Sequence, residues 1–368
     1  MILGIDTSTY FEEEEVKAKY YRDGKEVDPL KEFRNNNVSH MRIRIWNDPY
    51  SEDKKPYLGG TSDLDKAIRL SKIASSYGYK LLWDFHYSDF WADPGKQICP
   101  KAWKDLTFEQ VCKEVYKFTK ECLIKAKEND LDISLVQIGN EITNGMIWPF
   151  GKLDESTTPR GNYEHLSLLL KEGIKAAREV FPKIKIIIHL ERSYDQVVYA
   201  EYFDHLKQYN VDYDIIGMSY YPYWHGTFKQ FFANVNMCQQ RFNKDVMVME
   251  LGYSFTLEDY ILNNNGQAQL VVNGNSKDLI SNLPYPITKQ GQAQFIEEFL
   301  KLAKENNVKG VFYWEPMWIP CEDKICWASK EGQAYIHEEG KSTRNEWSNQ
   351  CLFDYKGEMN PSFDKFKI

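Results

Sequence analysis

Residues 133–141 read ISLVQIGNE, an apolar run that turns abruptly polar at its end. Nearly continuous hydrophobicity over six residues is typical of a parallel strand buried on both faces, because helices cover both sides of such a sheet. The run ends in a glycine, an amide and a carboxylate at 139–141. A polar pair directly after a buried strand is either solvated or directed at a ligand, and the rest of the sequence decides which.

Seven further apolar runs of this kind occur along the chain, and amphipathic stretches of helical period lie between most of them. The runs lie at 1–6, 39–46, 79–86, 184–191, 214–221, 245–250 and 310–316. The amphipathic stretches lie at 63–78, 107–130, 162–181, 194–210, 227–242 and 288–307. Eight strands in alternation with helices predict an α/β fold, a (β/α)8 TIM barrel.

The pattern predicts one catalytic domain over residues 1–368, since no linker or repeat interrupts it. Two long loops follow the seventh and eighth strands, at 253–287 and 316–350, and loops of this length in a compact fold are usually functional. The last helix is expected to be short or irregular. At the first amphipathic stretch, Asp63 is placed to favour a helix N-terminus.

The composition favours an uncharged partner, but the aromatic share does not by itself decide between a packed core and a sugar-binding cleft. Aromatic residues make up 15% of the chain, and rings of this kind stack on the apolar faces of sugars as well as filling cores. The net charge is -8, which argues against nucleic acid and anionic membranes as partners. We expect a monomer.

The cysteines do not indicate a disulfide-linked fold, and the hydropathy does not indicate a membrane-spanning protein. Seven scattered cysteines form no disulfide framework, although a local disulfide between Cys321 and Cys326 remains an open alternative. No apolar run approaches the ~20 residues of a membrane span. We expect a secreted or cell-surface protein whose leader is absent from the printed sequence, with a cytoplasmic location as the alternative.

Polar residues close the predicted strands, and in a barrel of this kind the active site lies at those ends. The strand-end residues are Asp6, Arg44, His86, Asn140, Glu141, Glu191, Tyr221, Glu250 and Trp314. Of the carboxylates among them, Glu141 after the fourth strand and Glu250 at the end of the seventh stand out, because opposite sides of a narrow barrel mouth can hold such a pair close together. Sugar hydrolysis with retention uses such a pair, one as nucleophile and one as acid and base.

The chain resembles the arabinogalactan endo-β-1,4-galactanase family, glycoside hydrolase family 53 of the retaining barrel clan. The matching motifs span the barrel: GIDTS at 4–8, RIRIWNDP at 42–49, LLWDFHYSDFWADPGKQ at 81–97, PKAW at 100–103, VQIGNEITNGMIWP at 136–149, IGMSYYPYWHGT at 216–227, VMELGYSFT at 248–256 and GVFYWEPMWIP at 310–320. The resemblance implies an endo-acting retaining hydrolase of β-1,4-galactosidic bonds in galactan or type I arabinogalactan.

The resemblance also implies a role for each site residue. Glu141 matches the acid/base and Glu250 the nucleophile, while Arg44 matches an arginine that would keep Glu250 ionised. Tyr221 would hydrogen-bond the nucleophile. The expected residues of the sugar site at the cleavage point are Asn140, His86 and Trp314, and those of neighbouring sugar sites are Trp91, Trp224 and His225.

No cofactor is expected for the chemistry, but a structural calcium ion remains open. Bacterial relatives bind calcium in their seventh and eighth loops, and residues 262–278 contain Asn and Asp without a recognisable ligand spacing. The sequence also departs from the family pattern at Leu251 and Gly252, after the nucleophile, where Thr-Ala is common.

Three alternative functions stay open at this point. Another retaining endo-glycanase, a β-mannanase or cellulase, would have similar strand ends. A metal-dependent barrel hydrolase would use Asp84, His86, His189 and Glu191, although the usual HxH spacing is absent. A binding protein without catalysis is disfavoured because both glutamates are present.

Overall fold

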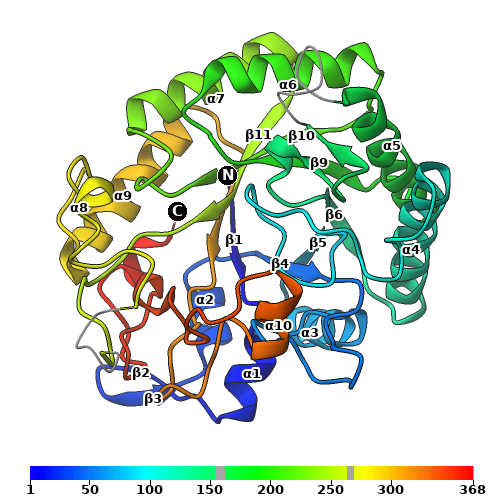
Figure 1. Cartoon of the computed structure of the whole chain (residues 1–368). Helices are drawn as coiled ribbons and strands as arrows, with labels where there is room; N and C mark the ends of the chain where they lie inside the picture. Colours follow the sequence, from blue (N-terminus) through cyan, green and yellow to red (C-terminus); the bar gives the residue numbers. More distant parts are fainter. Residues whose placement is uncertain (154–161, 263–268, 368) are drawn as a thin grey trace.

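Eight parallel strands close into a barrel in the computed structural model, which describes residues 1–153, 162–262 and 269–367. In chain order they are β1 (Ile2–Asp6), β4 (His40–Ile45), β5 (Lys80–Phe85), β6 (Ile133–Ile138), β9 (Lys185–Leu190), β10 (Ile215–Tyr220), β11 (Asp245–Leu251) and β12 (Gly310–Trp314). Each strand pairs with the next one, and β1 pairs with β12, so the sheet is closed (Figure 1). All eight predicted strands and the (β/α)8 fold are confirmed.

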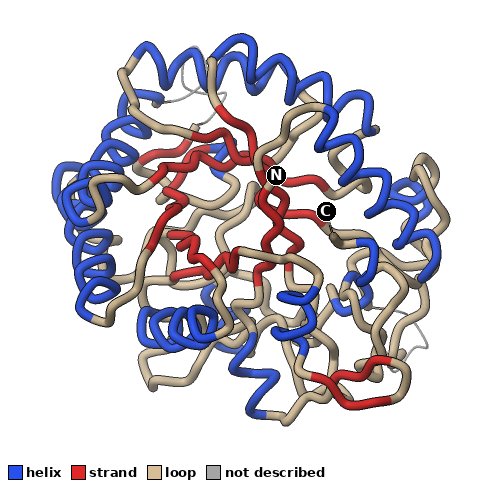
Figure 2. The backbone as a smooth tube through the Cα atoms, turned by 180° about the vertical axis from the view of Figure 1, so that it is seen from behind, coloured by secondary structure: helices blue, strands red, loops and turns tan. Residues whose placement is uncertain are grey.

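A ring of helices surrounds the strands, as both views show (Figures 1 and 2). Its members are α2 (Pro29–Asn35), α3 (Leu64–Ser76), α4 (Phe108–Glu128), α5 (Tyr163–Val180), α6 (Gln196–Gln208), α7 (Phe228–Phe242) and α9 (Lys289–Glu305). Asp63 accepts a hydrogen bond from the Lys66 amide at 2.8 Å and thereby caps α3, as predicted. Helix α2 was not predicted, because seven residues are too few for a clear helical period.

Short elements complete the chain between and after the barrel strands. They are α1 (Tyr10–Glu15), β2 (Tyr20–Arg22), β3 (Lys25–Val27), η1 (Ile142–Asn144), β7 (Gly145–Met146), β8 (Gly151–Lys152), α8 (Lys277–Ile280), α10 (Lys330–Tyr335), η2 (Ser348–Gln350) and η3 (Phe363–Lys365). The part of the chain after β12 therefore contains only short helices among its described residues, as expected from the sequence. No helix in the described segments is long and apolar enough to cross a membrane.

An apolar layer fills the barrel interior below the cleft, away from the carboxyl ends of the strands. It consists of Leu82, Leu135, Ile187, Ile215, Met247, Met249 and Phe312. Gly217 leaves room for this layer, since a Cβ there would lie 2.7 Å from Met249 Cγ. Because inward positions alternate along a strand, residues two places further along each strand point into the barrel above the layer. Asp84, Gln137 and His189 lie at such positions and are buried.

The two long loops lie next to each other and are joined by Arg344. Its Nε donates to Asp323 Oδ1 at 2.8 Å within the loop after β12. Its Nη1 donates to the Ile261 carbonyl at 2.8 Å, and its Nη2 lies 3.4 Å from Asp259 Oδ1, both in the loop after β11. One guanidinium thus ties together the two loops that border the mouth of the barrel.

Candidate active site

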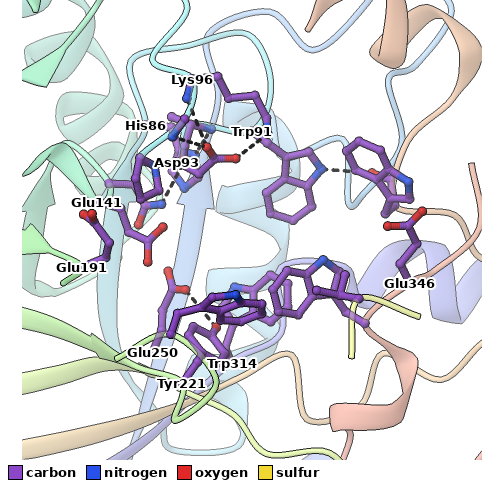
Figure 3. Close-up of a pocket in the computed structure, with 18 of the residues that line it drawn as sticks. His86, Trp91, Asp93, Lys96, Glu141, Glu191, Tyr221, Glu250, Trp314 and Glu346 are labelled. Atoms are coloured by element: carbon purple, nitrogen blue, oxygen red, sulfur yellow. Dashed lines mark hydrogen bonds and ion pairs between the residues drawn. The ribbon is translucent and has the colours of Figure 1, made fainter. Parts of the chain in front are cut away.

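A cleft of about 730 Å³ opens at the carboxyl ends of the strands. All ten site residues predicted from the sequence line it: Arg44, His86, Trp91, Asn140, Glu141, Tyr221, Trp224, His225, Glu250 and Trp314. They come from strands and loops distant in sequence. Figure 3 shows that Glu141 and Glu250 point toward one another inside this cleft.

Glu141 owes its position to an unusual backbone path after β6. Gly139 has φ 84°, and a Cβ there would lie only 2.7 Å from Ile142 Cγ2, so the turn requires glycine. Glu141 itself has φ 48°, in the left-handed region that few non-glycine residues adopt. A costly conformation at this residue is consistent with a functional role for its side chain.

Glu250 is turned into the cleft by a β-bulge. Along β10 and β11, Met218 lies opposite Val248, but Ser219 lies opposite Glu250, so Met249 is an extra residue on β11. Met249 packs inside the barrel, and strict alternation would turn Glu250 outward. The bulge instead directs two successive side chains inward, and the second of them is the carboxylate.

The two carboxylates are close enough for a retaining reaction. A carboxylate oxygen of Glu141 lies within 4.8 Å of one of Glu250. Retaining glycosidases hold their carboxyl groups ~5–5.5 Å apart, whereas inverting enzymes need ~6.5–9.5 Å to admit a water molecule. The spacing therefore fits direct attack by one carboxylate on the sugar.

The arginine beside the nucleophile position is Arg42, and the assignment of Arg44 to that role is wrong. Arg42 Nη1 lies 3.1 Å from Glu250 Oε1 and 2.9 Å from Asp6 Oδ2. Arg44 lines the cleft, but its Nη1 lies 2.6 Å from Glu315 Oε1 and 3.4 Å from Asp6 Oδ1. Both arginines point inward from β4, and Glu315 binds Arg44, the one nearer the carboxyl end of the strand.

Hydrogen bonding and nearby charges give the two glutamates different pKa values. Burial, followed by the charges of Glu250 and Glu191, raises the pKa of Glu141 well above its usual value. Burial also raises the pKa of Glu250, as do the charges of Asp6 and Asp84, but the Arg42 charge and the hydrogen bond from Tyr221 act to lower it. Tyr221 Oη donates to Glu250 Oε2 at 3.0 Å, as predicted for this tyrosine. Glu141 is thus the group that retains a proton when Glu250 has lost its own.

His86 lines the cleft with both ring nitrogens already engaged. Its Nδ1 lies 3.2 Å from Trp46 Nε1 and 3.2 Å from the Ala92 amide, and both of these are donors. Its proton is therefore on Nε2, 3.0 Å from Asp84 Oδ2. Burial lowers the pKa of His86, so the ring is neutral and its carbon edge is the part available to a sugar.

Asn140 is held rigidly and keeps one amide hydrogen for a ligand. Its Oδ1 accepts from Arg42 Nη2 at 2.7 Å and from Gln137 Nε2 at 3.0 Å. Its Nδ2 donates one hydrogen to the Ala92 carbonyl at 2.9 Å. The second hydrogen is suited to a sugar hydroxyl next to the bond that breaks, which is the role expected from the sequence.

Trp91 and Trp314 belong to the aromatic wall of the cleft. The Arg44 guanidinium lies 4.4 Å from the Trp91 ring centroid, and Trp91 Nε1 donates to the Trp327 carbonyl at 3.0 Å. The Trp91 and Trp314 centroids are 6.1 Å apart. Arg44 thus supports an aromatic platform, which replaces the role first assigned to it.

A second aromatic group lies on the β10 side. Trp347 lies 5.2 Å from Trp314 and 6.0 Å from Trp224, centroid to centroid, and the Trp224 side chain is 37% exposed. His225 Nδ1 accepts the Tyr221 amide at 3.1 Å, which leaves the ring proton on Nε2. Burial lowers the pKa of His225 to about 4, so it is a neutral donor at the cleft wall.

Several lining residues were not predicted from the sequence. They are Ala92, Asp93, Pro94, Gly95, Lys96, Asn144, Arg192, Tyr194, Val271, Trp318, Trp327, Glu338, Lys341, Glu346 and Trp347. Glu191 also lines the cleft, and it was considered from the sequence as a strand-end residue and as a metal ligand. The motif WADPGK could have indicated Asp93 and Lys96, but the residues of the eighth loop carry no periodic signal that would bring them to the cleft.

Metal-ligand types meet at one place within the described segments. Glu141, His189 and Glu250 offer one ligand atom each within 4.8 Å of one another. Asp84 and His86 are hydrogen-bonded to each other outside this group. Cys321 and Cys326 are both free thiols. Of the segment 262–278 considered for calcium, residues 263–268 lie outside the described residues.

A closed (β/α)8 barrel that holds two buried carboxylates at this spacing, in a cleft walled by tryptophan, defines a glycoside hydrolase of the retaining type. The sequence comparison agrees with the site. The model of Glycosyl hydrolase family 53 matches residues 2–366, and the chain belongs to this family. The membership overturns the metal-dependent hydrolase as an alternative.

Relatives and solved structures place the chain in the same group. It is 35% identical to an endo-beta-1,4-galactanase of Bacillus subtilis, over 100% of this chain and 85% of the relative. It is 30% identical to an arabinogalactan endo-beta-1,4-galactanase of Cellvibrio japonicus, over 99% of this chain and 90% of the relative. The solved GH53 catalytic domain of Ignisphaera aggregans is 36% identical, with a TM-score of 0.84 over 99% of this chain and 95% of that one.

Proposed function

We propose that this protein is an endo-acting β-1,4-galactanase that cleaves galactan or type I arabinogalactan with retention of configuration. The observation that carries the proposal is the facing pair Glu141 and Glu250, within 4.8 Å of each other at the floor of an open cleft. The substrate follows from the relatives, whose names describe endo-β-1,4-galactanases.

In the first half of the reaction, the Glu250 carboxylate attacks the anomeric carbon while Glu141 gives its proton to the glycosidic oxygen. The bond from the anomeric carbon to that oxygen breaks, and the shortened chain leaves as an alcohol. Arg42 and Tyr221 favour the ionised form of Glu250 and orient it for attack. The product is a sugar covalently bound to Glu250.

In the second half, Glu141 is a carboxylate and takes a proton from a water molecule. The hydroxide that forms attacks the anomeric carbon from the face that the first product left. The bond to Glu250 breaks, and the sugar is released with its original β configuration. The raised pKa of Glu141 suits both roles, because the group must hold a proton in one step and accept one in the next.

The shape of the cleft favours internal cleavage of a polymer. Tryptophans stand on both walls, so several sugar rings can stack at once. The axial 4-hydroxyl of galactose makes a β-1,4-galactan curve, whereas cellulose and mannan run nearly straight. We expect the aromatic platforms to suit the curved chain, and the relatives, which are named as endo-β-1,4-galactanases, weigh against a β-mannanase or a cellulase.

We infer that the protein works as a monomer, outside the cytoplasm, where such polymers occur. The reaction requires no cofactor, because the two carboxylates supply both the nucleophile and the proton. We infer that Arg344 stabilises the long loops in the way that a calcium ion would. Its positive charge binds Asp259 in one loop and Asp323 in the other.

A panel of polysaccharides tests the proposal. Pectic galactan should lose viscosity rapidly and yield short β-1,4-galacto-oligosaccharides, with little action on mannan, cellulose or β-1,3-galactan. Proton NMR should detect the β anomer among the earliest products. The Glu250→Ala variant, purified identically, controls for contaminating enzymes. Release of galactose alone from chain ends, or a preference for mannan, would refute the endo-galactanase assignment.

A further inference from the structure

A buried serine and a buried histidine lie behind Glu141, on the side away from the cleft. Ser219 Oγ lies 2.5 Å from Glu141 Oε1, and the same Oγ lies 2.9 Å from His189 Nε2. Both side chains are fully buried. Ser219 also lies opposite Glu250 in the strand register, so it occupies the barrel wall between the two carboxylates.

The direction of these hydrogen bonds follows from the groups around His189. Gln137 Nε2 donates one hydrogen to Asp84 Oδ1 at 2.6 Å and directs the other toward His189 Nδ1 at 3.1 Å and Asn140 Oδ1 at 3.0 Å. Asn140 Oδ1 also lies 3.1 Å from His189 Nδ1, but it already accepts from Arg42 Nη2 at 2.7 Å, whereas Gln137 Nε2 can only donate, so we assign Nδ1 as an acceptor. The single proton of the neutral ring is then on Nε2 and points at Ser219.

Ser219 has only one proton to donate, and His189 determines where it goes. Because His189 Nε2–H donates to the Ser219 oxygen, the serine hydroxyl is free to donate to Glu141 Oε1. Burial lowers the pKa of His189 well below its usual value, with Arg42 and His86 acting in the same direction. The ring therefore stays neutral, and the order of donors stays the same at working pH.

We propose that Ser219, oriented by His189, is a positioning residue that reserves Glu141 Oε1 as an acceptor and keeps the catalytic proton on Oε2. The inference rests on the proposed function, since it assigns the partner of its acid/base. In the first half-reaction, the proton on Oε2 moves to the glycosidic oxygen, and the Ser219 proton stays on the serine. In the second, the same hydrogen bond stabilises the carboxylate that receives a proton from water.

The proposal predicts a change in the pH profile of Ser219→Ala. A hydrogen bond to the ionised form lowers a carboxyl pKa, so its loss should raise that of Glu141 and move the basic limb of kcat/KM up by about one to two pH units. The other charged or titratable groups around Glu141 are unchanged in this variant: Glu250, Tyr221, Glu191, His189, Asp93 and Arg42.

A leaving-group comparison separates this role from simple packing. Attack on a dinitrophenyl β-galactobioside needs no proton donor, so its kcat/KM should stay within about twofold of wild type in Ser219→Ala. On galactan, kcat/KM should fall about ten- to hundredfold. Ser219→Cys keeps a weak donor of similar size. Its basic limb of kcat/KM should therefore lie at a pH between those of wild type and Ser219→Ala.

Ser193→Ala is the matched control. Ser193 is equally buried and donates to the Ser219 carbonyl at 2.7 Å, but its hydroxyl bonds the backbone and not Glu141. A wild-type basic limb in Ser219→Ala, an equal loss on both substrates, or the same shift in Ser193→Ala would overturn the inference. Wild-type protein that is inactive on every galactan would instead contradict the proposed function. The basic limb of kcat/KM would then be measured on an aryl glycoside that the protein cleaves, so the role of Ser219 would still be tested.

Discussion

The hydrogen bond between Tyr221 and Glu250 offers the sharpest test of the site, and Tyr221→Phe removes it with little change in shape. Tyr221 Oη donates to Glu250 Oε2 at 3.0 Å, and Tyr221 is 5% exposed. Burial and the Glu250 charge raise the pKa of Tyr221 well above its usual value, so its hydroxyl stays a donor throughout the working range. The ring of phenylalanine keeps the packing and loses only the donor.

The expected effect is largest on the acid side. A hydrogen bond to a charged group contributes about 1.5–3 kcal/mol. One pKa unit corresponds to about 1.36 kcal/mol, so the pKa of Glu250 should rise by up to about one to two units. Glu250 must be ionised to attack, and activity appears as pH rises through its pKa. A higher pKa therefore moves the acidic limb of kcat/KM to higher pH and leaves the basic limb, which belongs to Glu141, in place.

Initial rates on galactan between pH 3 and 9 measure this shift, with circular dichroism as a check on folding. Tyr223→Phe is the matched control, because Tyr223 is also buried, and its hydroxyl donates at 3.0 Å to Ser254 and not to Glu250. An acidic limb that stays at its wild-type position in Tyr221→Phe would refute the reasoning. An equal displacement of the acidic limb in Tyr223→Phe would also refute it, because the shift would then come from a general loss of packing in the cleft wall.

Four further perturbations probe the site and the loops. Glu250→Ala should lower turnover by several orders of magnitude with the fold intact, and azide should restore part of the activity on an activated substrate with an inverted product; near-normal hydrolysis would end the nucleophile assignment. Glu141→Gln should abolish the basic limb of the pH profile, which an unchanged limb would contradict. Chelators should leave kcat/KM unaltered. Arg344→Met should lower Tm by several degrees, because it leaves buried Asp259 unpaired, while Arg241→Met removes an exposed ion pair and should change Tm little.

The strands and most helices could be predicted because their signals are local. A doubly covered strand is apolar at nearly every position, and a surface helix repeats its apolar face every three to four residues. The capping residue Asp63 shows the same in detail, since its side chain acts on an amide only three residues away. The arrangement of the eighth loop, including Trp327 and Trp347, depends on contacts with distant chain and leaves no such periodic signal.

The two glutamates proposed as catalytic could be found from the sequence because each stands at the end of an apolar run, although each reaches the cleft by a backbone irregularity. Glu141 follows a glycine that a left-handed turn requires, and this glycine is visible in the sequence. The bulge that turns Glu250 inward has no such mark, because it inserts Met249, a residue that also suits regular strand. For Glu250, its place at the end of the apolar run and the resemblance to the family both indicated the cleft, whereas strict alternation along β11 would have turned its side chain outward.

The error over the two arginines shows where alternation along a strand ceases to discriminate. Arg42 and Arg44 are two positions apart on one strand, so both side chains point into the barrel. The sequence offers no rule for choosing between them. A strand rises about 3.3 Å per residue, which places Arg42 some two residues deeper. The deeper arginine reaches Glu250, whereas the shallower one is bound by Glu315. The resemblance to the family led to Arg44, but both arginines point inward, and only the three-dimensional arrangement of their acidic partners decides which of them contacts Glu250.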